Sequence, residues 1–263
     1  MFTDLFNYIK SIACGSSDSE ASDANNSNGS GKRGSSPSIM IEMRKAKKLI
    51  TIEGNISSGK SYCVDKLREV YANDDSVAIL LEPLTIWQSI KDEEGQDMIT
   101  KFYGDIPKYS FAFQMMAYIS RLVALKEALA NPTVKVVITE RSLLTDKNVF
   151  AKMLFEDKKM ESVEHQIYLK WFDHFIQELP SHDIIYIRTD PEVAYKRLQQ
   201  RARQGESASL EYLKQVHSAH EEWLSASDEA TMIDGNVDKD SDYAAWTYVA
   251  TYVKQIVDEQ DKQ

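Results

Sequence analysis

The sequence contains a glycine-rich loop of the kind that binds nucleotide phosphates. Gly54, Gly59, Lys60 and Ser61 match the pattern G-x-x-x-x-G-K-[ST]. In such a loop the backbone N–H groups surround the phosphates, the lysine reaches the outer phosphates, and the final hydroxyl can hold Mg²⁺. The other positions of this phosphate loop, assigned to the same nucleoside-triphosphate site, are Asn55, Ile56, Ser57 and Ser58. A glycine turn on the surface is the alternative interpretation.

A carboxylate suited to proton transfer follows an apolar run at residues 77–81. Glu82 ends this run, and Pro83 prevents further strand pairing because proline lacks a backbone N–H. A carboxylate placed there can accept the proton of an attacking hydroxyl, which typically accelerates a reaction by roughly 10²- to 10⁴-fold. We therefore expect Glu82 to be a general base, with a solvated carboxylate as the structural alternative.

A second acidic residue and an arginine follow the apolar run at residues 134–139. Glu140 can hold Mg²⁺ directly or through water, together with Ser61. Arg141 can contact a phosphoryl group during its transfer and stabilise the developing negative charge. The alternative is that Glu140 and Arg141 simply pair with each other.

Three arginines stand at the end of a predicted helix. Arg197, Arg201 and Arg203 form the pattern R-x-x-x-R-x-R, and another helix is predicted to begin near Leu210. A cationic loop between two helices can close over phosphates and exclude water. The sequence therefore predicts an arginine-rich lid, with a solvated helix face as the alternative.

A predicted helix from about residue 108 to residue 130 carries polar residues on one face. Gln114, Ala117, Tyr118 and Arg121 are spaced so that they share that face. The Gln114 amide offers both a donor and an acceptor, which complements the edge of a nucleobase. Aromatic rings that can stack on a base occur at Trp87, Tyr103, Phe111 and Phe113. The pattern predicts a nucleobase pocket, and an ordinary core is the alternative.

The elements that must position these residues alternate along the chain. Strand-like apolar runs occupy residues 49–52, 77–81, 134–139, 184–187 and 231–233, and amphipathic helical segments cover roughly 84–130, 142–179, 190–225 and 240–258. This alternation indicates an α/β fold with a parallel sheet and helices on both faces. Ligands of such sheets bind at the carboxyl ends of the strands. We therefore expect Glu82, Glu140 and the segment 234–236 to share one edge with the phosphate loop.

The composition limits the classes of partner and compartment. The formal net charge is −10, which argues against a nucleic-acid polymer as partner. The two cysteines, Cys14 and Cys63, match no metal or disulfide pattern, which indicates a reducing compartment. No apolar run approaches the roughly 18 residues of a membrane span, so we expect no stable membrane association. We expect a cytoplasmic protein, with a nuclear location left open and a mitochondrial one fitting less well.

Residues 1–45 differ in composition from the rest of the chain. Residues 15–38 are nearly all Ser, Asp, Asn and Gly, too polar to form a packed core, and predict a disordered tail. Apolar residues at helical spacing within 2–13 predict a short amphipathic helix, either a docking or membrane-surface helix with Cys14 as a lipidation candidate or a weakly ordered end. A mitochondrial presequence fits poorly because Asp4 is present and no arginine precedes Arg33. We expect one folded domain over residues 46–263.

Six motifs occur here in the order typical of one enzyme family. They are the phosphate loop, Glu82-Pro83 with Trp87, Phe113-Gln114, Glu140-Arg141-Ser142, the arginine-rich lid and Leu210-Glu211-Tyr212-Leu213. Over residues 47–260 the chain resembles the cellular deoxyribonucleoside kinases, most closely their deoxycytidine, deoxyguanosine and deoxyadenosine kinase branch. The resemblance implies a P-loop kinase fold with a five-stranded sheet and transfer of the γ-phosphate of ATP to the 5′-hydroxyl of a deoxynucleoside, in nucleotide salvage. It also implies a homodimer with a helical interface.

The resemblance implies roles for single residues. Glu82 matches the family's base and Arg141 its partner at the 5′-hydroxyl, while Lys60, Arg201 and Arg203 are the remaining catalytic candidates. For the nucleoside, Tyr103 and Glu211 match the pair at the sugar 3′-hydroxyl, Gln114 matches the base-reading glutamine, and Trp87 and Phe113 match pocket walls. For ATP, the candidates beyond the phosphate loop are Arg197, Arg201, Asp234 and Asn236, of which the last two match only loosely.

The resemblance extends to residues that select the base. Ala117, Arg121 and Asp146 resemble the constellation of deoxycytidine and deoxyguanosine kinases, whereas thymidine-preferring relatives have smaller or apolar residues at the last two positions. An ionised Asp146 accepts from an exocyclic amine and repels the 4-keto oxygen of thymine, and Arg121 crowds the 5-methyl group. We predict that deoxycytidine and purine deoxynucleosides are favoured over thymidine, with a thymidine-preferring kinase as the alternative.

Three other interpretations fit the sequence less well. A thymidylate kinase typically has Asp-Arg-Tyr where this chain has Glu140-Arg141-Ser142, and it lacks the element around Glu82 and Trp87. A GTPase needs an Asn-Lys-x-Asp motif, which this sequence lacks. A non-catalytic, kinase-like subunit of an assembly is expected to have lost Lys60, Glu82 or the lid arginines, all of which are present.

Overall fold

A computed structural model describes residues 47–201, 208–225, 230–237 and 244–260 of the chain. The predicted tail over residues 1–45, with Cys14, lies outside the described residues, as does Arg203 of the predicted lid. The division of the chain at residue 45 therefore stays a prediction. Within the described ranges, no helix combines the length and the apolar character needed to cross a lipid bilayer.

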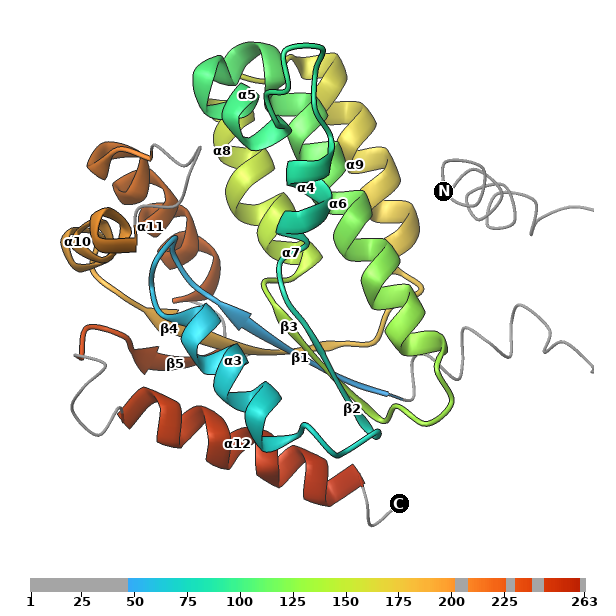
Figure 1. Cartoon of the computed structure of the whole chain (residues 1–263). Helices are drawn as coiled ribbons and strands as arrows, with labels where there is room; N and C mark the ends of the chain where they lie inside the picture. The colour runs from blue at the N-terminus through green and yellow to red at the C-terminus, as the bar shows by residue number, and fades with distance from the viewer. Residues whose placement is uncertain (1–46, 202–207, 226–229, 238–243, 261–263) are drawn as a thin grey trace, which may run out of the picture. The chain divides into compact units, whose positions relative to one another are not determined.

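The described residues form one parallel sheet of five strands in the order β2-β3-β1-β4-β5 (Figure 1). The strands are β1 (Lys48–Glu53), β2 (Val77–Leu80), β3 (Val136–Glu140), β4 (His182–Arg188) and β5 (Ala230–Asp234). The central strands β1 and β3 are almost entirely buried, which is why their sequences are apolar runs rather than alternating patterns. The predicted α/β fold and its parallel sheet are confirmed.

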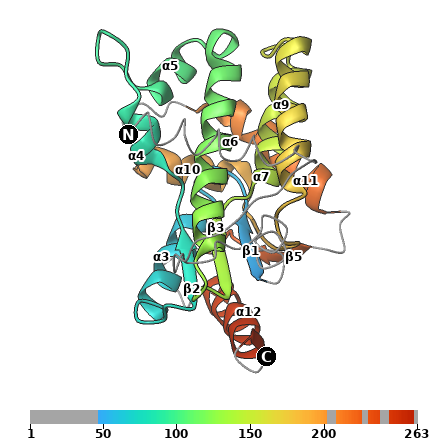
Figure 2. The same ribbon diagram turned by 90° about the vertical axis from the view of Figure 1, so that its right-hand side faces the viewer.

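Helices cover both faces of this sheet (Figures 1 and 2). The covering helices are α3 (Lys60–Val70) and α12 (Ala244–Gln260) on one face and α6 (Ile106–Ala130) and α9 (Ser162–Ile176) on the other. Ile50 packs with Leu67 and Val253 in the first core, whereas Leu49 packs with Leu122 in the second. Successive side chains of a strand point to opposite faces, so β1 contributes to both cores.

The helical segment predicted over residues 84–130 is three helices in the structure. They are α4 (Leu84–Ser89), α5 (Met98–Gly104) and α6. The Asp97 carboxylate accepts from the Thr100 N–H at 2.8 Å, and the Asp105 carboxylate accepts from the Lys108 N–H at 3.3 Å. Each aspartate therefore caps the start of a new helix. As a result α4 and α5 fold back beside α6 (Figure 2).

The segment predicted over residues 142–179 is also divided. It contains α7 (Leu143–Thr145), the π-helical turn η1 (Asp146–Ala151), α8 (Lys152–Glu156) and α9. A π-helix has i→i+5 hydrogen bonds and occurs mostly as single turns within α-helices, which are frequent at functional sites. Here the turn begins at Asp146, one of the predicted base-selecting residues. The next helices along the chain are α10 (Pro191–Arg201) and α11 (Leu210–Leu224), and α11 begins where the sequence predicts.

Candidate active site

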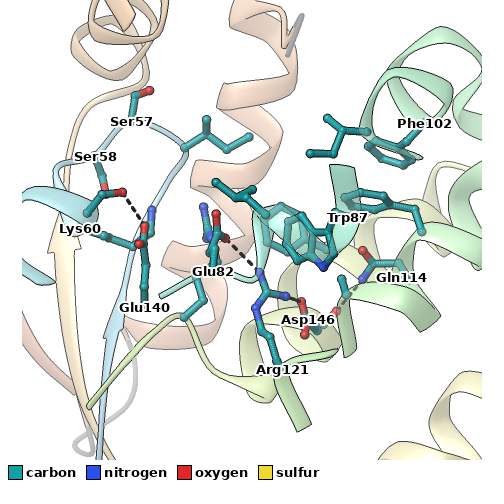
Figure 3. Close-up of a pocket in the computed structure, with 18 of the residues that line it drawn as sticks. Ser57, Ser58, Lys60, Glu82, Trp87, Phe102, Gln114, Arg121, Glu140 and Asp146 are labelled. Carbon is teal, nitrogen blue, oxygen red and sulfur yellow. Dashed lines mark hydrogen bonds and ion pairs between the residues drawn. The ribbon is translucent and has the colours of Figure 1, made fainter. Parts of the chain in front are cut away.

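A pocket lies between the phosphate loop and the helices α4, α5 and α6 (Figure 3). The space between these elements is about 830 Å³, the open mouth included. Most residues singled out from the sequence line it: Ile56, Ser57, Ser58, Gly59, Lys60, Ser61, Glu82, Trp87, Tyr103, Phe113, Gln114, Ala117, Arg121, Glu140, Arg141, Asp146 and Arg201. The structure therefore brings the predicted phosphate and nucleoside halves into one space.

The phosphate loop connects β1 to α3 and has backbone angles that favour glycine. Gly54 and Gly59 have φ values of 145° and 109°. A Cβ atom at Gly54 would lie 2.6 Å from the Ile187 carbonyl oxygen, so a side chain there would also clash. Gly59 is the cap of α3, so the first backbone N–H groups of that helix face the loop, as anion binding requires.

Lys60 is buried inside the phosphate loop. Its Nζ donates to the carbonyl oxygen of Asn55 at 2.6 Å, and the Asn55 amide donates to the Leu213 carbonyl oxygen of α11 at 2.8 Å. Burial, and next the positive charge of Arg141, lower the pKa of Lys60 to about 7. A phosphate group entering the loop would supply the negative charge that restores the charged form of the lysine.

Ser61 and Glu140 meet at the end of β3. The Ser61 hydroxyl donates to Glu140 Oε1 at 2.7 Å. Burial, and next the negative charge of Glu82, raise the pKa of the Glu140 carboxyl. A hydroxyl and a buried carboxylate beside a phosphate loop are suitable Mg²⁺ ligands or partners of its coordinated waters, since Mg²⁺ usually takes one or two carboxylates together with substrate phosphates.

Two arginines hold the carboxylate of Glu82. Arg141 Nε and Arg121 Nη2 each donate to Glu82 Oε1 at 2.9 Å. Arg121 also donates through Nη1 to Asp146 Oδ1, so its guanidinium lies between the two acidic residues (Figure 3). The predicted base, its predicted arginine partner and both predicted base-selecting residues therefore belong to one charge network.

Arg141 has an unfavourable backbone conformation. Its φ of 65° lies in the left-handed region, which costs roughly 1–3 kcal/mol for a residue with a side chain. The conformation is held from several sides, because the Arg141 N–H donates to the Ile52 carbonyl oxygen at 3.1 Å and Nη1 donates to the Gly54 carbonyl oxygen at 2.8 Å. The guanidinium also lies 5.0 Å from the ring centre of Phe150. Strain of this kind clusters at active sites.

Asp146 is almost completely buried at the start of η1. Burial raises the pKa of the Asp146 carboxyl to about 6, while the neighbouring Arg121 acts in the opposite direction. Asp146 Oδ2 has no hydrogen-bond partner among the described residues. The Gln114 amide donates to the Asp146 backbone carbonyl oxygen at 3.3 Å, so both residues face the same part of the pocket (Figure 3).

Aromatic rings form another wall of the pocket. The Trp87 and Phe113 ring centres lie 5.5 Å apart in an edge-to-face arrangement, and Phe102 stacks on Phe113 at 4.4 Å. The Trp87 indole N–H donates to the Ser120 hydroxyl at 2.9 Å, which fixes the ring. The Arg121 guanidinium lies 5.1 Å from the Trp87 ring centre. This wall can stack on a flat base while the polar residues contact its edge.

The predicted ATP residues outside the phosphate loop have mixed placements. Arg197 donates to three backbone carbonyls, those of Ser58 at 3.3 Å, Gly235 at 2.8 Å and Val237 at 2.8 Å. The Asn236 side chain accepts from the Asp190 N–H at 2.9 Å, and the Asp234 side chain accepts from the Asn236 N–H at 2.9 Å. Arg197 therefore ties the segment 235–237 to the phosphate loop, and direct contacts of these residues to ATP stay predictions.

Several described residues that the sequence analysis proposed for the site do not line the pocket, namely Gly54, Asn55, Phe111, Tyr118, Arg197, Glu211, Asp234 and Asn236. Phe111, a candidate stacking ring, packs against the second core instead. Glu211 is exposed in the first turn of α11 and does not line the pocket, although the next residue, Tyr212, does. Tyr118 does not share the pocket with Gln114, Ala117 and Arg121. It packs in the second core, and its hydroxyl donates to the Trp171 carbonyl oxygen at 3.2 Å. The prediction that all four residues share the pocket face of α6 was therefore wrong for Tyr118.

The pocket also contains residues that the sequence analysis did not single out. They share an apolar or aromatic side chain, and they are Leu84, Ile99, Phe102, Phe150 and Tyr212. Single aromatic residues in amphipathic helices carry no local signal that separates a pocket wall from a core position. Only the packing of four helical elements, α4, α5, η1 and α11, brings them together.

Comparison with known proteins agrees with this geometry. The sequence model of the family described as deoxynucleoside kinase matches residues 50–258. The chain is 36% identical over 211 residues to deoxycytidine kinase of Rattus norvegicus, covering 72% of this chain and 80% of that protein. It is 34% identical over 188 residues to mitochondrial thymidine kinase 2 of Homo sapiens, covering 70% and 67%. It is also 32% identical over 196 residues to mitochondrial deoxyguanosine kinase of Xenopus laevis, covering 67% and 73%.

These relatives are kinases named for three different nucleosides, so their names agree on the reaction and differ on the base. The family implies ATP as the phosphate donor and a role in nucleotide salvage. With the family match over most of its length and the phosphate loop, Glu82 and Asp146 in one pocket, the chain belongs to the deoxynucleoside kinase family and is a nucleoside kinase.

Proposed function

We propose that this kinase transfers the γ-phosphate of ATP to the 5′-hydroxyl of a 2′-deoxynucleoside and favours deoxycytidine and purine deoxynucleosides over thymidine. The observation that carries the proposal is the Arg121 guanidinium, which joins Glu82 to Asp146 within the pocket. Glu82, the proposed base for the 5′-hydroxyl, and Asp146, the proposed reader of the nucleobase, lie on either side of this guanidinium. A nucleoside bound between them would direct its 5′-hydroxyl to Glu82 and its base to Asp146.

For the transfer step, Glu82 accepts the proton of the 5′-hydroxyl as its oxygen attacks the γ-phosphorus and the bond to the β-phosphate oxygen breaks. Arg141 contacts Glu82 and the phosphate loop, so it can stabilise charge on the phosphoryl group in transfer. Lys60 and Arg201 line the same part of the pocket and add positive charge. The role of Arg203 is proposed from the sequence alone.

We further propose that Ser61 and Glu140 hold Mg²⁺ beside the phosphates of ATP. The contact between their side chains at 2.7 Å supports this assignment. Among the described residues, no group of three or more His, Cys, Asp or Glu side chains is arranged to hold a metal ion. This agrees with an ion that completes its coordination with phosphate oxygens and water, as Mg²⁺ usually does.

For the nucleoside, we propose that Gln114 and Asp146 read the base edge, that Trp87 and Phe113 pack on its face, and that Ala117 leaves room for it. Tyr103 and Glu211 are proposed for the 3′-hydroxyl. Glu211 would need to approach the pocket when the nucleoside binds, because its side chain is exposed one residue before the pocket residue Tyr212.

We also propose a homodimer. Val163, Ile167 and Trp171 lie four residues apart on α9 and are 58%, 42% and 48% exposed. Their spacing places them on one face of the helix, and an exposed apolar stripe of this kind favours association. We propose a cytoplasmic location because the two cysteines match no disulfide pattern, although relatives include mitochondrial proteins.

The test is a comparison of kcat/KM for the four natural deoxynucleosides with Mg-ATP. We expect deoxycytidine or a purine deoxynucleoside to rank first and thymidine last. The double variant Arg121→Met with Asp146→Ala should move the preference towards thymidine, because it removes both the crowding of the 5-methyl group and the acceptor.

A matched control removes another ion pair of the same helix. Lys126 on α6 pairs with Glu178 at 2.7 Å outside the pocket, so Lys126→Met with Glu178→Ala should leave the ranking unchanged. A wild-type preference for thymidine would favour the thymidine-preferring alternative. Absence of turnover with every deoxynucleoside in the folded protein would favour a non-catalytic subunit.

A further inference from the structure

The residue before the phosphate loop is a buried glutamate that does not line the pocket. Glu53 ends β1, is fully buried and does not line the pocket. One of its oxygens, Oε2, accepts a hydrogen bond from the Thr145 hydroxyl. Thr145 is also fully buried and lies outside the pocket lining. Burying a carboxylate is costly unless it is hydrogen-bonded, so this contact is a strong constraint on both segments.

The two partners stand directly beside the two halves of the site. Glu53 precedes Gly54, the first residue of the phosphate loop, and Thr145 precedes Asp146, the proposed reader of the base. A hydrogen bond between their side chains therefore fixes the distance between the end of β1 and the start of η1. It does so from behind the pocket, where no substrate can replace it.

Further contacts hold the short segment that Thr145 ends. The Arg141 N–H donates to the Ile52 carbonyl oxygen and its guanidinium donates to the Gly54 carbonyl oxygen. The Thr145 N–H donates to the Ser142 hydroxyl at 3.2 Å. Residues 141–145 are thus attached to the end of β1 near both of their ends, once through Arg141 and once through Thr145.

We propose that Glu53 and Thr145 form a clamp that positions Asp146 relative to the phosphate loop, and that both are positioning residues for base selection. The inference rests on the proposed role of Asp146. Without the clamp, the first turn of η1 would lose its side-chain link to the end of β1 and would keep its helix hydrogen bonds and its contacts with Arg121 and Gln114. Loss of this constraint would allow Asp146 a wider range of positions. Misplacement of a group in an active site by about 1 Å can cost roughly 10²-fold in rate.

The primary test is Thr145→Val, which removes the hydroxyl and keeps the shape of the side chain. Because deoxycytidine and thymidine share every phosphate contact, the ratio of their kcat/KM values reports on base reading alone. We expect this ratio to move towards one by about tenfold. Thr145→Ser, which keeps the hydroxyl, should restore the wild-type ratio to within about twofold.

The matched control is Thr51→Val. Thr51 lies on the same strand and the same face as Glu53, is equally buried, and its hydroxyl has no hydrogen-bond partner among the described residues. We expect its ratio to stay within twofold of the wild type. The comparison separates the clamp from the general effect of removing a buried hydroxyl.

Thr145→Val leaves a buried carboxylate without its donor and can prevent folding. The second variant, Glu53→Met with Thr145→Val, removes both partners, and replacing both by apolar groups of similar shape is often nearly neutral for stability. The proposal is overturned if a folded variant without the clamp keeps the wild-type ratio to within twofold while its melting temperature falls, because the contact is then only structural.

The wild-type protein tests the proposed base preference, and the variants test the clamp. If the wild type favours thymidine, the proposed base preference fails, but a clamp still predicts that its loss moves the ratio towards one. If no nucleoside is turned over, the same ratio is taken from dissociation constants. In that case, a ratio of dissociation constants that stays within twofold of the wild type in a folded variant without the clamp refutes the proposal.

Discussion

Burial changes the proton affinity of two side chains at opposite ends of the pocket. The pKa of Lys60 is lowered to about 7, and the pKa of Asp146 is raised to about 6. In both cases the charged form is the one that the proposed function uses, and in both cases a bound ligand supplies the partner that favours it. The effect of Lys60 on phosphoryl transfer can therefore be measured separately from the effect of Asp146 on base preference.

Lys60→Ala should abolish phosphoryl transfer while nucleoside binding persists. Loss of a single group that stabilises transition-state charge typically costs roughly 10²- to 10³-fold, and Lys60 also holds the loop through Asn55. We expect the dissociation constant for the nucleoside, measured by calorimetry, to change by less than about threefold. Lys66→Ala is the control, because Lys66 lies on the same helix and pairs with Glu69 on the surface. Loss of nucleoside binding in a folded Lys60→Ala variant would contradict the two-part site.

Base preference should depend on pH through Asp146. Above a pH of about 6 its carboxylate is ionised and accepts from an exocyclic amine, whereas below that pH a growing fraction is protonated and tolerates the thymine keto oxygen. The ratio of kcat/KM for deoxycytidine to that for thymidine should therefore fall as the pH is lowered from 8 to 5. Asp146→Asn should remove this dependence. An equal slope in the variant would assign the titration to another group.

At the scale of elements, the sequence predicted those features that have a short, local sequence signal. The phosphate loop, the five strands and the start of α11 follow from glycine spacing, apolar runs and helix start signals. The breaks at Asp97 and Asp105 were missed because an aspartate inside an amphipathic segment is a cap only if the chain turns there. The π-helical turn at 146–151 was missed because one extra residue per turn has no signature of its own. Phe150 and Tyr212 join the pocket through tertiary packing alone.

Arg197→Ala should weaken ATP binding by loosening the connection between two elements. Arg197 makes three hydrogen bonds that hold the segment 235–237 against the phosphate loop, and each contributes about 0.5–1.5 kcal/mol. We expect the KM for ATP to rise several-fold while the KM for the nucleoside is unchanged. Arg197→Lys discriminates between roles. A lysine keeps the charge but not the planar fork, so it should rescue a direct phosphate contact and fail to rescue this connection.

At the scale of the whole molecule, the exposed stripe on α9 predicts the oligomeric state. Trp171→Glu places a charge in the middle of the stripe and should convert a dimer into a monomer, as measured by sedimentation velocity. Val70→Glu is the control, because Val70 is 62% exposed on α3, on the opposite face of the sheet. A wild-type protein that sediments as a monomer at micromolar concentration would contradict the proposed dimer.

The π-helical turn at Asp146–Ala151 makes the number of residues in this segment as important as their identity. An α-helix advances about 100° per residue, so deleting one residue from the turn would convert it to an α-helical turn and rotate one flank relative to the other. Asp146 would then leave the pocket even though every side chain of the network remained encoded. Among variants of this kinase, a change in length within this turn should therefore be less tolerated than most substitutions, and base selection depends on a spacing that no single residue reveals.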